Sequence, residues 1–168
     1  MMKKINLFAA AALLFASPVL IAATTIQITG KVVASPCVVD DSLSVDLGQD
    51  IQAKDLETAG TGSDWVPFTL DLKQCPSGTT SVTVAFSGTP DTADATRLYQ
   101  NSGTAKNIAV ELLDDQNTPL GNGSTATKTI DKTSHSYTYN LKARAYTALG
   151  EVMPGTIASE VLVAFTYN

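Results

Sequence analysis

The chain has 168 residues, and its 11 Lys and Arg against 16 Asp and Glu give a formal net charge of −5. An acidic chain without a basic stripe is a poor candidate for binding nucleic acid or an anionic membrane. This length is enough for one domain with one core, and no linker or fixed-period repeat indicates a second domain.

The first 23 residues have the pattern of a secretory signal peptide. A basic start, MMKK, leads into the apolar run INLFAAAALLFA, and small residues allow cleavage after Ala22 or Ala23. The apolar run is short for a membrane span of about 20 residues, and no stop-transfer segment follows. We therefore expect export and cleavage, and the loss of Lys3 and Lys4 then lowers the net charge from −5 to −7.

The next segment, TTIQITGKVV (24–33), alternates in the manner of a β-strand. Ile26, Ile28, Gly30 and Val32 share one face. Glycine weakens a strand interior, so Gly30 indicates either a bulge or a place where a partner comes too close for a side chain.

The two cysteines, Cys37 and Cys75, are the only pair in the chain. In an oxidising compartment such a pair usually forms a disulfide. Two cysteines 38 residues apart and a single histidine do not supply a tetrahedral metal site.

The rest of the chain reads as short strands separated by turn residues. One helical turn is expected in IQAKDLETAGTGSD, ended by Gly60, and the polar stretch TPDTADATRLYQNSGTA is expected to be a surface loop or an irregular edge. No apolar period of 3.6 residues follows the signal peptide, so the pattern predicts an all-β sandwich or barrel. The expected strands lie around Leu43–Leu47 and in VPFTLDLKQC, SVTVAFSG, KNIAVELLDD, SYTYNLKARAYTA and TIASEVLVAFTYN.

The final strand has no returning strand to cover it. Val161, Val163, Phe165 and Tyr167 share one face, and the sequence stops at Asn168. An uncovered apolar edge would aggregate, so it needs a neighbour, and segment 24–33 is the remaining candidate. That segment either folds back onto its own chain, giving a complete sandwich, or fills the gap in another copy, and periodicity does not choose between the two.

Residues that suggest chemistry have simpler explanations. His135 has only Ser134 and Ser136 as strand neighbours, on the opposite face, and is interpreted as a solvated strand histidine. The pairs Asp40-Asp41 and Asp114-Asp115 fit turns or solvated edges better than calcium loops. No nucleophile motif, phosphate-binding loop or metal-ligand cluster is present, so we expect no enzyme activity and no cofactor.

Two further features allow a functional and a structural interpretation. Asn122-Gly123-Ser124 matches a glycosylation sequon but also reads as a turn. Trp65, at a strand start, is interpreted as core or core rim rather than as a platform for a sugar.

The chain resembles the pilins of chaperone–usher fimbriae over essentially its whole mature length. The resemblance rests on the extension ITGKVV, the cysteines in SPC and LKQC, the penultimate Tyr167, and Gly155 as the fourteenth residue from the end. The segments GKVVASPC, CPSGTTSVTVAFSG, QNSGTAKNIAVELLDD and the GTI at Gly155 are most similar to the minor tip-fibrillum adaptor of type 1 fimbriae, and less similar to the major rod subunit.

The resemblance implies an incomplete immunoglobulin-like β-sandwich that lacks its seventh strand and is completed in trans by a donor strand. Residues 1–23 would be the signal peptide, 24–33 the donor-strand extension and 34–168 the pilin domain. The groove would be filled first by a periplasmic chaperone and then, at the outer-membrane usher, by the extension of the next subunit. The implied donor residues are Ile26, Ile28, Gly30 and Val32, and the implied chaperone and groove residues are Gly155, Val161, Val163, Phe165, Tyr167 and Asn168.

The implied function is that of a structural subunit, exported through the periplasm to a surface fimbrium that supports cell adhesion. Its partners would be the chaperone, the usher and neighbouring subunits, with the tip adhesin among the candidates, and neither nucleic acid nor a small-molecule substrate. A minor tip adaptor is favoured. The alternatives are a major rod subunit and a secreted complete sandwich that binds a glycan or protein.

Overall fold

A computed structural model of the chain describes residues 27–33 and 35–168. The chain divides into two compact units, Met1–Lys31 and Val32–Asn168. In the first unit the described residues 27–31 form no helix or strand. The second unit contains all the elements below.

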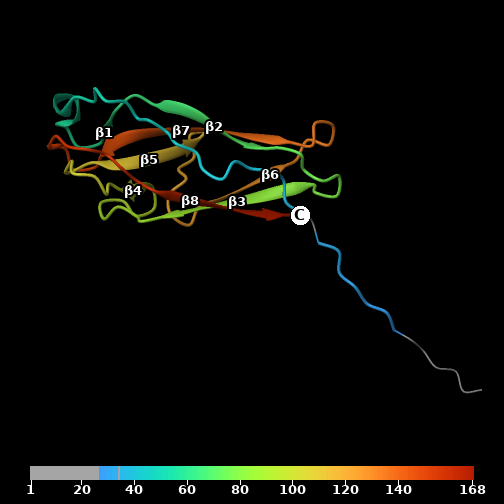
Figure 1. The fold of residues 1–168 in the computed structure, drawn as a ribbon. Coiled ribbons are helices and arrows are strands. Elements are labelled where there is room, and N and C mark those ends of the chain that lie inside the picture. The colour runs from blue at the N-terminus through green and yellow to red at the C-terminus, as the bar shows by residue number, and fades with distance from the viewer. Residues whose placement is uncertain (1–26, 34) are drawn as a thin grey trace, which may run out of the picture. The chain divides into compact units, whose positions relative to one another are not determined.

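The second unit is built from strands and one short 3-10 helix, η1 (Ala53–Leu56) (Figure 1). The strands are β1 (Thr61–Gly62), β2 (Val66–Leu72), β3 (Ser81–Gly88), β4 (Leu98–Gln100), β5 (Ala109–Asp114), β6 (Thr125–Thr129), β7 (Tyr137–Thr147) and β8 (Val161–Tyr167).

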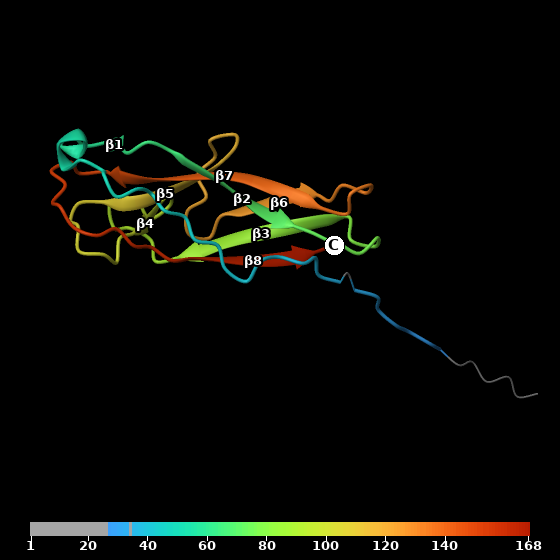
Figure 2. The same ribbon diagram turned by 45° about the horizontal axis from the view of Figure 1, so that its top comes forward.

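These strands form two antiparallel sheets, which Figures 1 and 2 show as two layers. In the five-stranded sheet β7 lies between β5 and the successive strands β2 and β1, and β4 pairs with the other edge of β5. In the three-stranded sheet β3 lies between β6 and β8. Within the described residues β8 is therefore an edge strand, and it is also the C-terminal strand.

The core lies between the two sheets because each inner strand directs alternate apolar residues inward. On β3, Val82 and Val84 are 0% exposed and Phe86 is 1% exposed. They meet residues of β2, β5 and β7, among them Leu72 and Leu141. A second cluster joins Leu56 of η1 to Ala105, Ile108 and Ala145.

Period-two alternation correctly predicts β2, β3, β5, β7 and β8, and the helical turn that was expected before Gly60 is η1. The all-β prediction is confirmed. The polar strand β6 (TATKT) was not predicted, because it carries almost no apolar alternation and depends on its pairing with β3.

Two expectations are wrong, and a third is only partly right. Residues 43–47 form no strand. Segment 89–105 does lie at a sheet edge, as one of its two expected forms required, but it contains the regular strand β4. Leu98 and Tyr99 of β4 are buried, and the Tyr99 hydroxyl donates a hydrogen bond to the Leu120 carbonyl. His135 lies in a turn with φ of 50° rather than in a strand, and β7 begins only at Tyr137.

Candidate functional site: a groove beside the last strand

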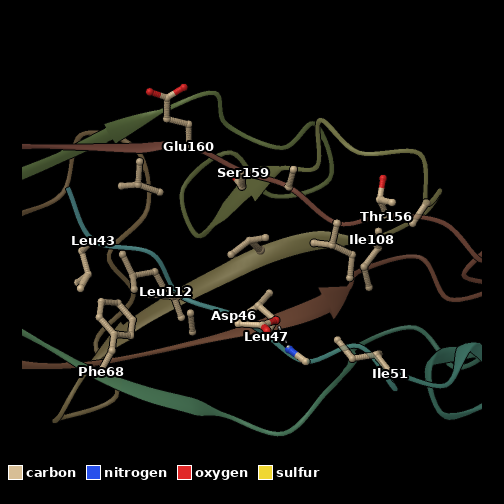
Figure 3. Close-up of a pocket in the computed structure, with 18 of the residues that line it drawn as sticks. Leu43, Asp46, Leu47, Ile51, Phe68, Ile108, Leu112, Thr156, Ser159 and Glu160 are labelled. Carbon is tan, nitrogen blue, oxygen red and sulfur yellow. Dashed lines mark hydrogen bonds between the residues drawn. The ribbon is translucent and has the colours of Figure 1, made fainter.

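An open cavity of about 1220 Å³ runs along β8. Its floor is apolar and comes from both sheets, with Phe68, Phe86 and Leu112 among the contributors. One wall is segment 39–49, and the other is the chain from Val152 to Phe165. Figure 3 shows Leu43 and Leu47 on the first wall, and Thr156, Ser159 and Glu160 on the second.

The backbone of β8 is open toward this groove. Ser81 and Asn168 exchange both N–H···O bonds, at 3.0 and 2.9 Å, so the backbone groups of even-numbered β8 residues point to β3. Those of Val161, Val163, Phe165 and Tyr167 therefore point to the opposite edge, where no described strand pairs with them. The side chains of these four residues pack against the core and are only half-buried.

The facing wall is open in the same way. Val38 pairs with Lys73 through bonds of 2.8 and 2.9 Å, but residues 39–49 form no further ladder within the described chain. Val39, Val45 and Leu47 pack against the core. The alternation expected around Leu43–Leu47 is thus present, but the strand is not, because no described strand pairs with this segment.

The predicted disulfide is confirmed: Cys37 is bonded to Cys75, and both residues are buried. The bond ties the beginning of the 39–49 wall to the chain just after β2. The Cys75 N–H also donates a hydrogen bond to the His135 carbonyl at 2.9 Å. The backbone of His135 therefore links its turn to the disulfide.

Gly155 lies six residues before β8, where the groove wall contacts the chain around Ala105. A β-carbon at Gly155 would overlap backbone atoms of Ala105, so only glycine fits there. The N–H of Ala105 donates to Thr156, and the N–H of Ser102 donates to Ala158, at 3.1 and 2.8 Å. These bonds extend the wall beyond β8.

The last residue of β8, Tyr167, and the terminal Asn168 are held beside β3. The Asn168 carbonyl accepts hydrogen bonds from the N–H groups of Thr80 and Ser81. Burial raises the pKa of Tyr167, and a hydrogen bond from the Cys37 backbone partly offsets this rise.

The described residues of the predicted donor strand are exposed. Ile28 and Val32 are 89% and 99% exposed, and Gly30 has nothing within 4 Å of the position of a β-carbon. Ile26 lies outside the described residues. Residues 27–33 form no strand, so their part in function remains a prediction.

The other candidate residues have structural roles. Asp114 Oδ1 accepts from the N–H groups of Gln116 and Thr118, and Gly123 has a φ of 85°, as turns require. Among residues 27–33 and 35–168 no cluster of His, Cys, Asp or Glu could hold a metal ion. In the same ranges no helix has the length and apolar character needed to cross a membrane.

Sequence reasoning missed a buried charge on the five-stranded sheet. Glu111 is 3% exposed and accepts from Arg97 Nε at 2.6 Å and from Arg144 Nε at 2.7 Å. Its hydrogen bond raises the pKa of Arg97. The Arg144 guanidinium lies 4.2 Å from the centre of the Trp65 ring, so Trp65 forms the rim of this cluster. The position of a Glu within an alternating strand does not predict that it is buried and paired with two arginines.

Comparison with known proteins agrees with this geometry. The family described as fimbrial protein matches residues 26–168, and the chain belongs to it. FimG of Escherichia coli (strain K12) is 43% identical over 161 residues, covering 95% of this chain and 94% of that protein.

Two solved structures share the fold. The P pilus rod subunit PapA has a TM-score of 0.65 at 20% identity, over 80% of this chain and 100% of its own. A subunit of a chaperone–usher pilus also has a TM-score of 0.65 at 20% identity, over 91% and 100%. The chain is therefore a fimbrial subunit with the incomplete sandwich of the pilins, as the resemblance predicted.

Proposed function

We propose that the chain is a structural subunit of a chaperone–usher fimbria and polymerises by donor-strand exchange. In this proposal residues 1–23 are a signal peptide, cleaved after Ala22 or Ala23. Residues 24–33 are the donor strand, and residues 34–168 form the pilin domain with its groove. The protein acts by assembly and carries no catalysis.

The observation that carries the proposal is the pair of open backbone edges, β8 and segment 39–49, over an apolar floor. An extended strand laid between them would satisfy polar groups on both sides. Burying Ile26, Ile28 and Val32 would each stabilise the joint by about 1.5–3 kcal/mol. A head-to-tail joint of this kind does not close on itself, so it propagates a fibre.

The same groove would serve during export. A periplasmic chaperone would cover it first, with Val161, Val163, Phe165 and Tyr167 as the zipper and the Asn168 carboxylate as the anchor. At the outer-membrane usher the extension of a neighbouring subunit would then replace the chaperone, and the finished filament would lie on the cell surface. Truncation of the last four residues should abolish co-purification with the chaperone.

A minor tip adaptor is the particular role we favour, with the tip adhesin as one candidate neighbour. The similarity to FimG along nearly the whole chain supports it. The alternative is a major rod subunit. Counting copies per fibre by quantitative mass spectrometry distinguishes the two, because a rod subunit would be in large excess over the adhesin.

The proposal is tested by completing the sandwich within one chain. The mature chain is compared with a version that carries a second copy of residues 24–33 after Asn168, joined by a flexible linker. We expect the first to be of low stability or to polymerise, and the second to be a stable monomer. A matched control carries Asp at the added positions of Ile26 and Ile28, and should behave like the first.

A complete sandwich would give the opposite result. The mature chain alone would be a stable monomer, and hydrogen exchange would show protected amides in residues 24–33. That outcome would favour a secreted binding domain over a fimbrial joint.

A further inference from the structure

Glu160 lies on the groove wall immediately before β8. Its side chain is exposed, and Figure 3 shows it projecting away from the cavity. Neither ion pair found in the described residues involves it. By contrast, Asp46 on the facing wall accepts hydrogen bonds from Gly48 and Gln49 within its own loop.

The predicted donor strand has one charged residue, Lys31. Period two places Lys31 on the face opposite to Ile28, Gly30 and Val32. When those residues point into the groove, Lys31 points to solvent, on the same side as Glu160.

The register of the joint is restricted, because only shifts by two residues keep the apolar face inward. All paired strands in the described residues are antiparallel. An antiparallel strand with Ile26 opposite Phe165, where the groove wall ends, places Lys31 directly opposite Glu160. A shift that sets Ile26 opposite Tyr167 places Lys31 opposite Leu162, diagonal to Glu160.

Both registers bring the two charges within reach. Residue 160 is even-numbered, so its backbone groups point away from the incoming strand and it forms a non-hydrogen-bonded pair, in which side chains are closest. Directly opposite β-carbons lie about 4.5–5.5 Å apart and diagonal ones about 7–8 Å. A parallel strand with Ile26 beside Val161 would instead place Lys31 beside Thr166, at the other end of β8.

We propose that Glu160 selects the charge and register of the incoming strand, and that the occupant it fits is segment 24–33 of a second copy, through Lys31. This inference rests on the proposed function. The pair is exposed, so it adds little to the stability of a finished joint. Its effect is discrimination, since an acidic residue in the place of Lys31 would meet Glu160 as a like charge.

The test is a charge-reversal cycle. A fluorescent peptide of residues 24–33 and its Lys31→Glu form, each in excess, are refolded with the mature chain and with its Glu160→Lys variant, so that the peptide fills the groove before another copy can. The dissociation rates of the resulting complexes are then measured. We expect Lys31→Glu to speed dissociation from the unchanged chain about three- to tenfold, and Glu160→Lys to reverse that preference. In about 1 M salt the Debye length is about 3 Å, so both ratios of dissociation rates should fall toward one.

Controls separate this pair from net charge. Glu57→Lys changes the chain by the same charge at a residue outside the groove, and a Gln27→Glu peptide adds an acid at the other end of the strand. Neither should show coupling. If the Lys31 and Glu160 effects are additive, the selection proposal is wrong even though the peptide binds. If the unchanged peptide does not bind at all, the donor-strand function itself fails.

Discussion

β3 and β8 are neighbouring strands of one sheet with the same alternating pattern, yet they are buried to different extents. The register sets Val84 beside Phe165 and Phe86 beside Val163. On β3 the inward residues are 0–1% exposed. Their partners on β8 are only half-buried.

The difference lies in the number of neighbours. β3 pairs on both edges, with β6 and β8, whereas β8 has one described partner. Alternation thus determines which side chains turn inward, but full burial also needs a strand on the second edge. β8 has side chains suited to a core position that the described residues of one chain do not complete.

The largest contrast should appear in a matched pair of Phe→Ala changes. Phe86→Ala should destabilise the fold by about 3–5 kcal/mol, because Phe86 is a closed core residue. Phe165→Ala should cost about half as much or less in the chain alone, because that side chain is still partly exposed. Urea unfolding, at a chain concentration low enough to prevent polymerisation, measures both.

A saturating concentration of a peptide of residues 24–33 should increase the loss of unfolding free energy caused by Phe165→Ala, and so bring it closer to the loss caused by Phe86→Ala. Equal costs without peptide would show that β8 is already covered, and the contrast between the strands would then disappear.

The same contrast explains how far sequence reasoning reaches. Alternation predicts β3 and β8 equally well, because it depends only on which side chains face inward. It failed at Leu43–Leu47, where a suitable pattern lacks a pairing partner, and at β6, where a polar segment is held by pairing with β3. The contacts of Glu111 and the close approach of Gly155 to Ala105 depend on residues distant in sequence, so no local pattern reveals them.

The disulfide should affect both regions, because it joins the open wall to the closed sheet. Replacing Cys37 and Cys75 by Ser should cost about 2–4 kcal/mol, since the bond closes a loop of 38 residues. The measurement is urea unfolding of the double variant against the oxidised chain. Peptide binding should weaken as well, because segment 39–49 loses its anchor. Unchanged binding in the folded double variant would mean that this wall is positioned without the disulfide.

Two glycines give a smaller contrast between the groove wall and the predicted donor strand. Gly155→Ala should destabilise the chain by about 1–3 kcal/mol, because its β-carbon meets the backbone of Ala105. Gly30→Ala should change stability by less than about 0.5 kcal/mol, since its surroundings are empty.

A bulkier change at Gly30 separates stability from assembly. A peptide of residues 24–33 with Gly30→Leu should exchange poorly into the groove, whereas the same change in the chain should leave its fold intact. If Gly30→Leu unfolds the chain, then the first strand belongs to the chain's own sandwich.

A last contrast concerns tyrosine ionisation in the closed and open regions. Tyr99 is fully buried, and burial raises its pKa to about 12. A phenol whose pKa is higher in the folded state than the usual value of about 10 contributes stability that is complete below pH 10. That contribution is lost as the pH rises through about 12, because the unfolded chain ionises first. The urea midpoint should therefore fall across this range, and less so in Tyr99→Phe.

Tyr167 on β8 reports whether the open region can be closed. Burial already raises its pKa, although the side chain is only half-buried. A strand in the groove would remove more water from the phenol and should therefore raise its pKa further. Titration of phenolate absorbance with and without the 24–33 peptide measures this shift, and in Tyr167→Phe the shift should vanish. A shift that persists in that variant would come from another tyrosine, and the peptide would then bind elsewhere than along β8.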